Sequence, residues 1–228
     1  MRNVLILCLV LGLGGSAFAQ DILVYDQNSN NQYAQTAAMA ISPAGTVVAG
    51  ASNFNTLLTS QDWDVVAVDL PSTKITGGWG PFIDYVNAGG AGIVSYWDWD
   101  ADPALVTAMG ADSYLQSIST VGQTLSDTGE TAIFSGVTMP HSSWFDSWFD
   151  DGDTFDLSAG SVPIATMSGY PSGPVMFTGN GGRTIGSFVI DEWQGDGAVQ
   201  LWTNMITFVP EPGSLLLLGG LVALIRRR

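Results

Sequence analysis

Basic residues are scarce in this chain, and their scarcity narrows the partners it can have. The 228 residues include six lysines and arginines against 21 aspartates and glutamates, which gives a net charge of −15 at pH 7. Apart from Arg2 and three arginines at the C-terminus, Lys74 and Arg183 are the only strong bases. Such a chain repels phosphate backbones and anionic lipid headgroups, so we exclude nucleic-acid binding and adsorption to anionic membranes. It would attract divalent cations.

Thiols and imidazoles are nearly absent too, which excludes most nucleophilic chemistry. The single cysteine, Cys8, lies in a segment that we expect to be removed, so the mature chain has no disulfide, thiolate ligand or cysteine nucleophile. Any Ser-His-Asp arrangement would depend on His141, the only histidine, which stands beside two serines. A lone histidine in that setting is typical of a surface loop. We therefore assign no catalytic residue and expect a non-enzymatic protein.

Residues 1–19 have the three parts of a secretory signal peptide. Arg2 supplies the positive charge, Val4 to Leu13 supply the apolar region, and Ala17-Phe18-Ala19 supplies the cleavage pattern of small residues. The apolar run is too short to span a bilayer comfortably. We expect an exported mature chain that starts at Gln20 and forms one domain over residues 20–208.

The C-terminal segment, residues 209–228, combines three features in a specific order. Pro210-Glu211-Pro212 leads into the apolar stretch 213–225, and the chain ends in Arg226-Arg227-Arg228. As a helix the apolar stretch would measure roughly 20 Å, against a hydrocarbon core of about 30 Å. It is therefore short for a permanent anchor. The order of parts closely resembles the PEP-CTERM sorting signal of bacterial exported proteins.

That resemblance implies a route and a destination for the chain. It implies recognition by an exosortase-type membrane transpeptidase and cleavage near Pro210-Glu211-Pro212. The apolar stretch would hold the chain in the inner membrane transiently, with the arginines in the cytoplasm. The product would be released or attached at the cell surface. Proteins of this family accompany exopolysaccharide and biofilm matrix, so extracellular polysaccharide is an expected partner.

The body is organised around a strand, a helix and a second strand between Asp62 and Asp102. Residues 65–70 and 92–96 are apolar runs with the length of buried strands. The apolar residues between Phe82 and Val86 are spaced for one helical face, and Gly89-Gly90 ends that helix. A strand, a crossover helix and a parallel strand form the unit of an α/β sheet that is covered on both faces.

The flanking patterns predict further elements in a similar alternation. We expect strands at 22–25, 46–49, 115–121, 162–167, 175–178 and 183–190. We expect helices at 33–41, 53–60, 103–109 and 197–208, and an irregular loop after 132–134. Asn180-Gly181 predicts the hairpin turn between the last two strands, and Asn53 and Asp102 are candidate N-caps. The order predicts an α/β fold: a doubly wound, mostly parallel sheet with helices on both faces, plus a C-terminal hairpin and helix.

On this pattern the body resembles a divergent class I glutamine amidotransferase-like domain of the flavodoxin-like kind. The resemblance is carried by residues 64–69, 82–90, 133–137 and the hairpin 182–186. It implies a nucleophilic cysteine in a glycine-flanked turn after a strand. The turn nearest to that position is Ser95-Tyr96-Trp97, which has no cysteine and a bulky indole. We therefore do not expect the family's activity.

Ligands of a doubly wound sheet bind at the carboxyl ends of its strands. The candidates for ligand binding at those ends are Asp26, Asp69, Trp97, Asp98 and Asp100. A tandem Ser-Trp-Phe-Asp repeat at 143–150 adds Trp144 and Trp148, which a helix would stack on each other. Aromatic faces beside carboxylates suit sugar binding. A lid of aromatic rings over the edge of the core would explain the same pattern.

Alternating aspartates at the end of the second strand resemble the start of a calcium loop. They are Asp98, Asp100 and Asp102, but Pro103 and Met109 stand where an EF-hand needs glycine and glutamate. The run fails as an EF-hand. It remains compatible with an irregular oxygen-ligand site, and equally with a solvated acidic loop.

A second acidic run offers Asp150, Asp151 and Asp153 as metal ligands, and calcium is the only cofactor that we consider.

Three functional hypotheses follow from these patterns. The first is an exported, surface-sorted protein that acts in binding or matrix structure without catalysis. The second is a glycan hydrolase that uses paired carboxylates, such as Asp69 with Asp98 or Asp100. The third is a calcium-dependent adhesion module.

Overall fold

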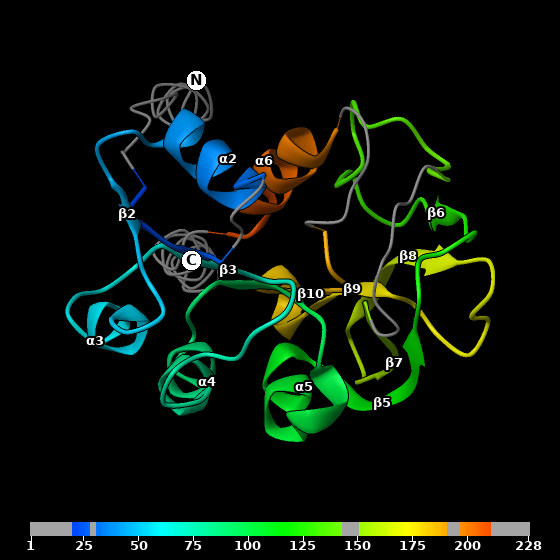
Figure 1. Cartoon of the computed structure of the whole chain (residues 1–228), viewed down its shortest axis with the longest axis horizontal. Helices are drawn as coiled ribbons and strands as arrows, with labels where there is room; N and C mark the ends of the chain where they lie inside the picture. The colour runs from blue at the N-terminus through cyan, green and yellow to red at the C-terminus, as the bar shows by residue number, and fades with distance from the viewer. Residues whose placement is uncertain (1–19, 28–30, 143–150, 191–196, 211–228) are drawn as a thin grey trace, which may run out of the picture.

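The computed structural model describes residues 20–27, 31–142, 151–190 and 197–210. Figure 1 shows how these ranges form one large sheet with helices on two sides and a small sheet at one end. The large sheet has eight strands in the order β2-β1-β3-β4-β10-β9-β8-β6, and the small sheet pairs β5 with β7. The predicted doubly wound, mostly parallel α/β fold is confirmed.

The strands fall into three groups. Five neighbours in the large sheet run parallel: β2 (Thr46–Val48), β1 (Ile22–Asp26), β3 (Val65–Leu70), β4 (Gly92–Tyr96) and β10 (Thr184–Ser187). Beyond β10 each strand is antiparallel to the one before it: β9 (Met176–Gly179), β8 (Val162–Met167) and β6 (Leu125–Asp127). The small sheet is antiparallel: β5 (Ala111–Ile118) and β7 (Gly152–Leu157).

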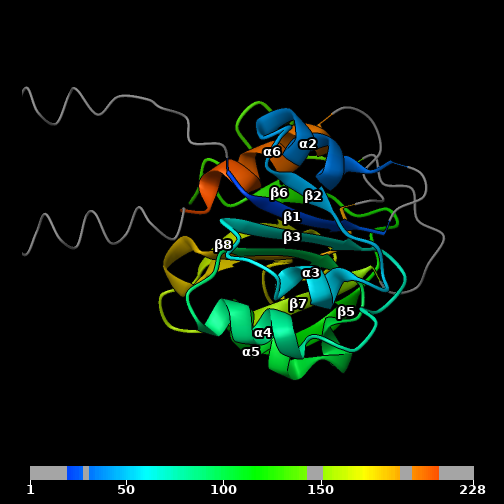
Figure 2. The ribbon, with the colours of Figure 1, turned by 90° about the vertical axis from the view of Figure 1, so that its left-hand side faces the viewer.

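Helices cover both faces of the large sheet, as Figure 2 shows. One face carries α2 (Tyr33–Ile41) and α6 (Ala198–Phe208), and the other carries α3 (Phe54–Leu58), α4 (Gly80–Asn87) and α5 (Pro103–Met109). Alternate residues of a strand therefore enter two separate cores. In β3, Val65 and Ala67 belong to the core that includes Trp202 of α6, whereas Val66 and Val68 belong to the core on the opposite face.

Several local predictions are confirmed by these boundaries. The helices at 33–41 and 103–109 begin and end where the sequence places them. The hairpin of β9 and β10 turns at Asn180-Gly181, whose φ angles of 54° and 69° are the positive values that such a turn needs. A short 3-10 helix, Asn180–Gly182, occupies the turn. Within the described ranges, no helix has the length and hydropathy to cross a membrane.

Several strands and two caps differ from the predictions. The strand expected at 115–121 is β5, which begins earlier and ends at Ile118, and neither β6 nor β7 was predicted. The Gly-Asp-Thr-Phe-Asp-Leu sequence of β7 has the glycine and acids of a loop, yet tertiary packing buries its first four residues. Asn53 and Asp102 do precede helices, but their side chains bond elsewhere. Asn53 Oδ1 accepts a hydrogen bond from Gly50 N–H (2.7 Å), and Asp102 Oδ2 accepts one from Tyr96 O–H (2.7 Å).

Candidate functional site

A row of polar side chains crosses the sheet where its parallel strands end. Strand register places Asp26 of β1 beside Asp69 of β3, Asp69 beside Ser95 of β4, and Ser95 beside Ser187 of β10. Residues that are paired in this way project from the same face of a sheet. Asp69, Ser95 and Ser187 are fully buried. The predicted candidates Asp26 and Asp69 are therefore neighbours, and the two serines extend the row they form.

The Ser95 hydroxyl is the centre of this row. It donates to Asp69 Oδ1 over 2.7 Å and accepts a hydrogen bond from the backbone N–H of Ile190 over 3.0 Å. The Phe188 carbonyl oxygen lies 3.1 Å from the same hydroxyl. One side chain therefore joins β3, β4 and the chain that leaves β10. Sequence reasoning missed this pair, although two polar residues at the ends of consecutive strands could have suggested it.

Asp26 holds the helix that follows its strand. The backbone N–H of Gln35, in the first turn of α2, donates to Asp26 Oδ2 over 3.1 Å. The unsatisfied N–H groups and the dipole at a helix N-terminus favour a negative charge there. The last residue of β1 therefore carries a carboxylate whose contact with α2 positions that helix over the sheet.

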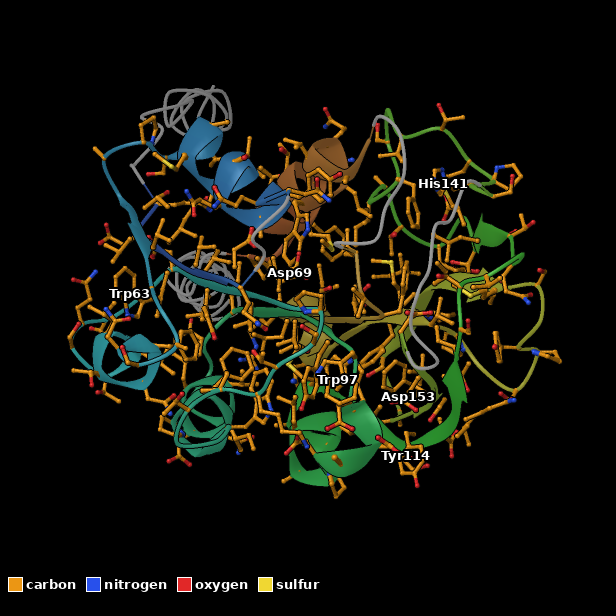
Figure 3. All side chains as sticks on the ribbon, in the orientation of Figure 1. Trp63, Asp69, Trp97, Tyr114, His141 and Asp153 are labelled. Atoms are coloured by element: carbon orange, nitrogen blue, oxygen red, sulfur yellow. The ribbon has the colours of Figure 1, made fainter. Side chains whose placement is uncertain are left out.

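Trp97 lies outside the row, where the loops after three strands meet. Its indole Nε1–H donates to the Thr73 carbonyl over 3.3 Å, and the Thr73 hydroxyl donates to Gln27 Oε1. Gln27 N–H in turn donates to the Asp69 carbonyl over 3.0 Å. The Trp97 ring is partly exposed, and Figure 3 shows it nearer to α5 than Asp69 is. These bonds hold an aromatic face at the carboxyl ends of the strands.

Charged side chains follow Trp97 and Thr73 directly in the sequence. Lys74 forms an ion pair with Asp98. The hydrogen bond between the two side chains is the main reason why the pKa of Lys74 is raised. Burial raises the pKa of Asp100 above its ordinary value, and the hydrogen bond and charge of neighbouring Asp98 raise it further. The backbone N–H of Asp100 donates to Asp153 Oδ2 over 3.2 Å. The first acidic run is therefore tied to Lys74 and to β7.

The second acidic run lies partly inside the fold. Asp151 and Asp153 are only 2% and 0% exposed. Asp151 Oδ2 accepts hydrogen bonds from the Thr120 N–H (2.7 Å) and the Thr120 hydroxyl (3.3 Å). In the part of the chain that the structure describes, no three acidic, histidine or cysteine side chains are grouped so that they could hold a metal ion. Asp150 lies outside the described residues, so the calcium site predicted there stays a prediction.

Trp144 and Trp148 also lie outside the described residues, and the sugar-binding prediction made for them stays a prediction.

His141 lies at the far edge of the large sheet, where its backbone pairs with Leu125 of β6 through hydrogen bonds of 2.8 and 3.0 Å. Four strands separate β4 from that edge, and Figure 3 shows His141 well away from Asp69. The histidine is thus not brought to the Ser95–Asp69 pair.

A small cavity lies apart from the strand ends. It has a volume of about 150 Å³ and lies at the end of α6, where it is lined by Ala132, Ile133, Asn204, Thr207 and Phe208. The Asn204 side-chain amide donates to the Ile133 and Ser135 carbonyls over 2.7 Å each. No lining residue is charged, and Asn204 serves to hold the adjacent loop on the helix.

Comparison with known proteins identifies the fold but no family. No family model matches the sequence, and no curated protein matches it. Among solved structures, one similar protein comes from Thermoplasma acidophilum and is provisionally described as part of a GMP synthase. It is 11% identical, with a TM-score of 0.56, and the match covers 89% of this chain and 99% of that one. A second, from Bacteroides uniformis, is described as ThuA-like: 13% identity, TM-score 0.51, and coverage of 87% and 96%.

Both neighbours have glutamine amidotransferase-like folds. They confirm the expected fold of the body, and at these identities they show the fold alone.

We expect the hydrogen bonds of the Ser95 hydroxyl to make a measurable contribution to the stability of the fold. Ser95→Ala would leave Asp69 Oδ1 and the Ile190 N–H with one partner fewer in a buried site, so we expect it to lower the free energy of unfolding by about 2 kcal/mol. Ser187→Ala is the matched control, because the equally buried Ser187 hydroxyl has no hydrogen-bond partner among the described residues. Urea denaturation of both variants measures the difference. Equal losses would contradict the role given to Ser95.

The raised pKa of Asp100 predicts a pH-dependent stability. Its folded pKa lies above the ordinary value of 3.8, so the stabilising contribution is present at low pH and lost as pH rises through the folded pKa. Asp100→Asn, which resembles the protonated acid, should raise the melting temperature at about pH 7 and lose that advantage towards about pH 4. The exposed Asp62→Asn controls for net charge. A gain that is independent of pH would refute this.

Proposed function

We propose that this protein is exported, sorted to the cell surface through its C-terminal segment, and active there in binding or matrix structure without catalysis. The observation that carries the proposal is the order of parts in residues 209–228: Pro210-Glu211-Pro212, an apolar stretch, and a terminal arginine cluster. An exosortase-type transpeptidase would cleave near the Pro-Glu-Pro sequence. The N-terminal charge, apolar run and Ala17-Phe18-Ala19 pattern support export by the general secretory route.

The strand ends support a body that binds rather than catalyses. The segment nearest to the position where amidotransferases place a cysteine is Ser95-Tyr96-Trp97, at the end of β4. Ser95 is buried, and its hydroxyl is occupied by Asp69 and Ile190. A nucleophile has to be accessible to substrate and activated by a base. The Ser95 hydroxyl instead donates within the sheet, as a structural side chain does.

Extracellular polysaccharide is the ligand class that this proposal favours. Trp97 offers a partly exposed indole face, with Asp98 and Lys74 beside it. Aromatic rings cover the apolar faces of sugars, and carboxylates and amines bond to sugar hydroxyls. Trp144 and Trp148 add the same residue types through the tandem repeat in the sequence. The neutral or weakly charged polymers of a matrix would not be repelled by the acidic body.

One observation favours a second candidate, a carboxylate-dependent glycan hydrolase. Asp100 has a raised pKa beside Asp98 at the strand ends, and general acids are tuned in this direction. The predicted partner Asp69 is less suited, because it is fully buried and bonded to Ser95. The pair for this candidate would therefore be Asp98 and Asp100.

The sorting proposal predicts processing that depends on the Pro-Glu-Pro sequence. In the producing cell, replacing Glu211 and Pro212 with alanine should leave the full tail in place and the protein in the membrane fraction. The unaltered chain should lose the tail and reach the surface or medium. Mass spectrometry of the C-terminal peptide distinguishes the two products. A matched pair of alanines at Thr203 and Thr207, on α6, should leave processing unchanged. Processing of the Glu211/Pro212 variant at the same rate would refute the proposal.

The binding proposal predicts retention on the producing cell's own polysaccharide. Trp97→Ala, or Trp144→Ala with Trp148→Ala, should reduce retention on immobilised matrix polysaccharide by roughly tenfold, because each ring supplies a stacking face. Tyr114→Ala, which removes an exposed ring from β5, is the control. Retention unaltered by all three tryptophan changes would reject polysaccharide binding at these rings. Release of soluble oligosaccharide, abolished by Asp100→Asn, would favour the hydrolase instead.

A further inference from the structure

One edge of the molecule carries no charge, although the chain as a whole is strongly acidic. Between Gln27 and Gln61 the sequence has no aspartate, glutamate, lysine, arginine or histidine, whereas the chain carries a net charge of −15. This stretch forms α2, β2 and α3. Figure 1 shows these elements together along one side of the molecule, and Figure 2 views that side face on. The absence of charge in the sequence therefore becomes an uncharged edge of the fold.

Apolar side chains are exposed on this edge. Met39 of α2 is 47% exposed, and Val47 and Val48 of β2 are 37% and 43% exposed. They come from adjoining elements and make up three of the seven large hydrophobic residues that are exposed in the described ranges. Val47 and Val48 are consecutive in β2 and project from opposite faces of the sheet, so apolar side chains are exposed on both sides of this strand. Exposed apolar residues at such an edge favour an interaction surface. Along the sequence the nearest acids are Asp26 and Asp62, just outside the uncharged stretch, and in the fold Asp21 precedes the residue that pairs with the start of β2.

The backbone of β2 also presents unused pairing groups. β2 is the last strand of the large sheet, and among the described residues it pairs only with β1. Gly45 C=O accepts from Ile22 N–H, and Ala49 N–H donates to Val24 C=O, so these odd-numbered positions face β1. Because successive residues of a strand direct their N–H and C=O groups to opposite sides, those of Val48 point away from β1. An exposed edge of this kind is a template for another strand.

We propose that β2 pairs with β2 of a second copy of this chain, in antiparallel orientation about a two-fold axis at Val48. The edge of β2 presents its N–H and C=O groups in strand geometry, which the edge of another strand complements directly. A two-fold contact places the uncharged edge against itself and keeps the acidic surfaces apart. The two Val48 residues would exchange N–H···O=C bonds at a Cα separation of about 5.5 Å. This proposal does not depend on the proposed export or binding.

A disulfide test follows from that separation, since Cα atoms about 4.4–6.8 Å apart can be bridged. In the full chain with Cys8→Ser, kept in a neutral detergent that shields the apolar terminal segments, Val48→Cys should give a covalent dimer on mild oxidation. Val121→Cys is the matched control, because Val121 is 56% exposed and lies outside the uncharged edge. We expect the Val48→Cys dimer to form at least roughly tenfold faster. Equal rates would overturn the proposal.

A charge test gives a second and independent readout. Val48→Glu should weaken the dimer, measured by sedimentation velocity, by roughly tenfold or more, because it sets two like charges opposite each other. Val121→Glu should have no such effect, and thermal melting checks that both variants fold. Added salt should strengthen the wild-type dimer, because it screens repulsion between acidic copies. A monomer at all salt concentrations overturns the proposal. The proposal is also overturned if the protein stays monomeric and binds neutral vesicles or polysaccharide through this edge.

Discussion

The hydrogen bond from Ser95 Oγ to Asp69 Oδ1 joins the two central strands around which the sheet is built. All six residues of β3 are buried, so the carboxylate of Asp69 needs compensation within the fold. Ser95 supplies part of it and, through Ile190, also fixes the path of the chain after β10. Ser95 thus holds neighbouring strands together. The likeness to the two solved structures shows the fold and gives no inference of activity.

Charge is the second constraint on this molecule, and it acts at the surface. Lys74 and Arg183 are the only strong bases between the two terminal segments, so few acidic side chains can form an ion pair. Lys74 is placed against Asp98, where it joins the loop after β3 to the loop after β4. Elsewhere the acids are compensated by hydrogen bonds, as Asp26 is by Gln35 and Asp151 is by Thr120. The uncharged edge of α2, β2 and α3 is conspicuous against this background, and mutual repulsion of the acidic surfaces leaves it as the favoured site of self-contact.

Much of the fold could be predicted because its central part has simple periodicities. The buried strands β3 and β4 are mostly apolar, and the helix between them has apolar residues on one face. The turn of β9 and β10 was predictable because Asn-Gly favours positive φ. β7 was not predictable, because its glycine and aspartates resemble a loop and only contact with β5 makes it a strand. The Ser95–Asp69 pair was missed because its partners are 26 residues apart: the sequence shows a polar residue near the end of each strand but does not show that the two side chains meet.

The sequence by itself determined the alternation of strands and helices, the acidic surface, the absence of a cysteine nucleophile in the body, and the character of the two terminal segments. These are properties of composition and of spacing along the chain. Only the tertiary structure decided which polar residues meet. It placed Asp69 beside Ser95 and Asp26, left His141 at the far edge, and brought three uncharged elements to one side. The order of the strands in the sheet determines which of these residues are neighbours, because it sets the distances between residues that are far apart in the sequence.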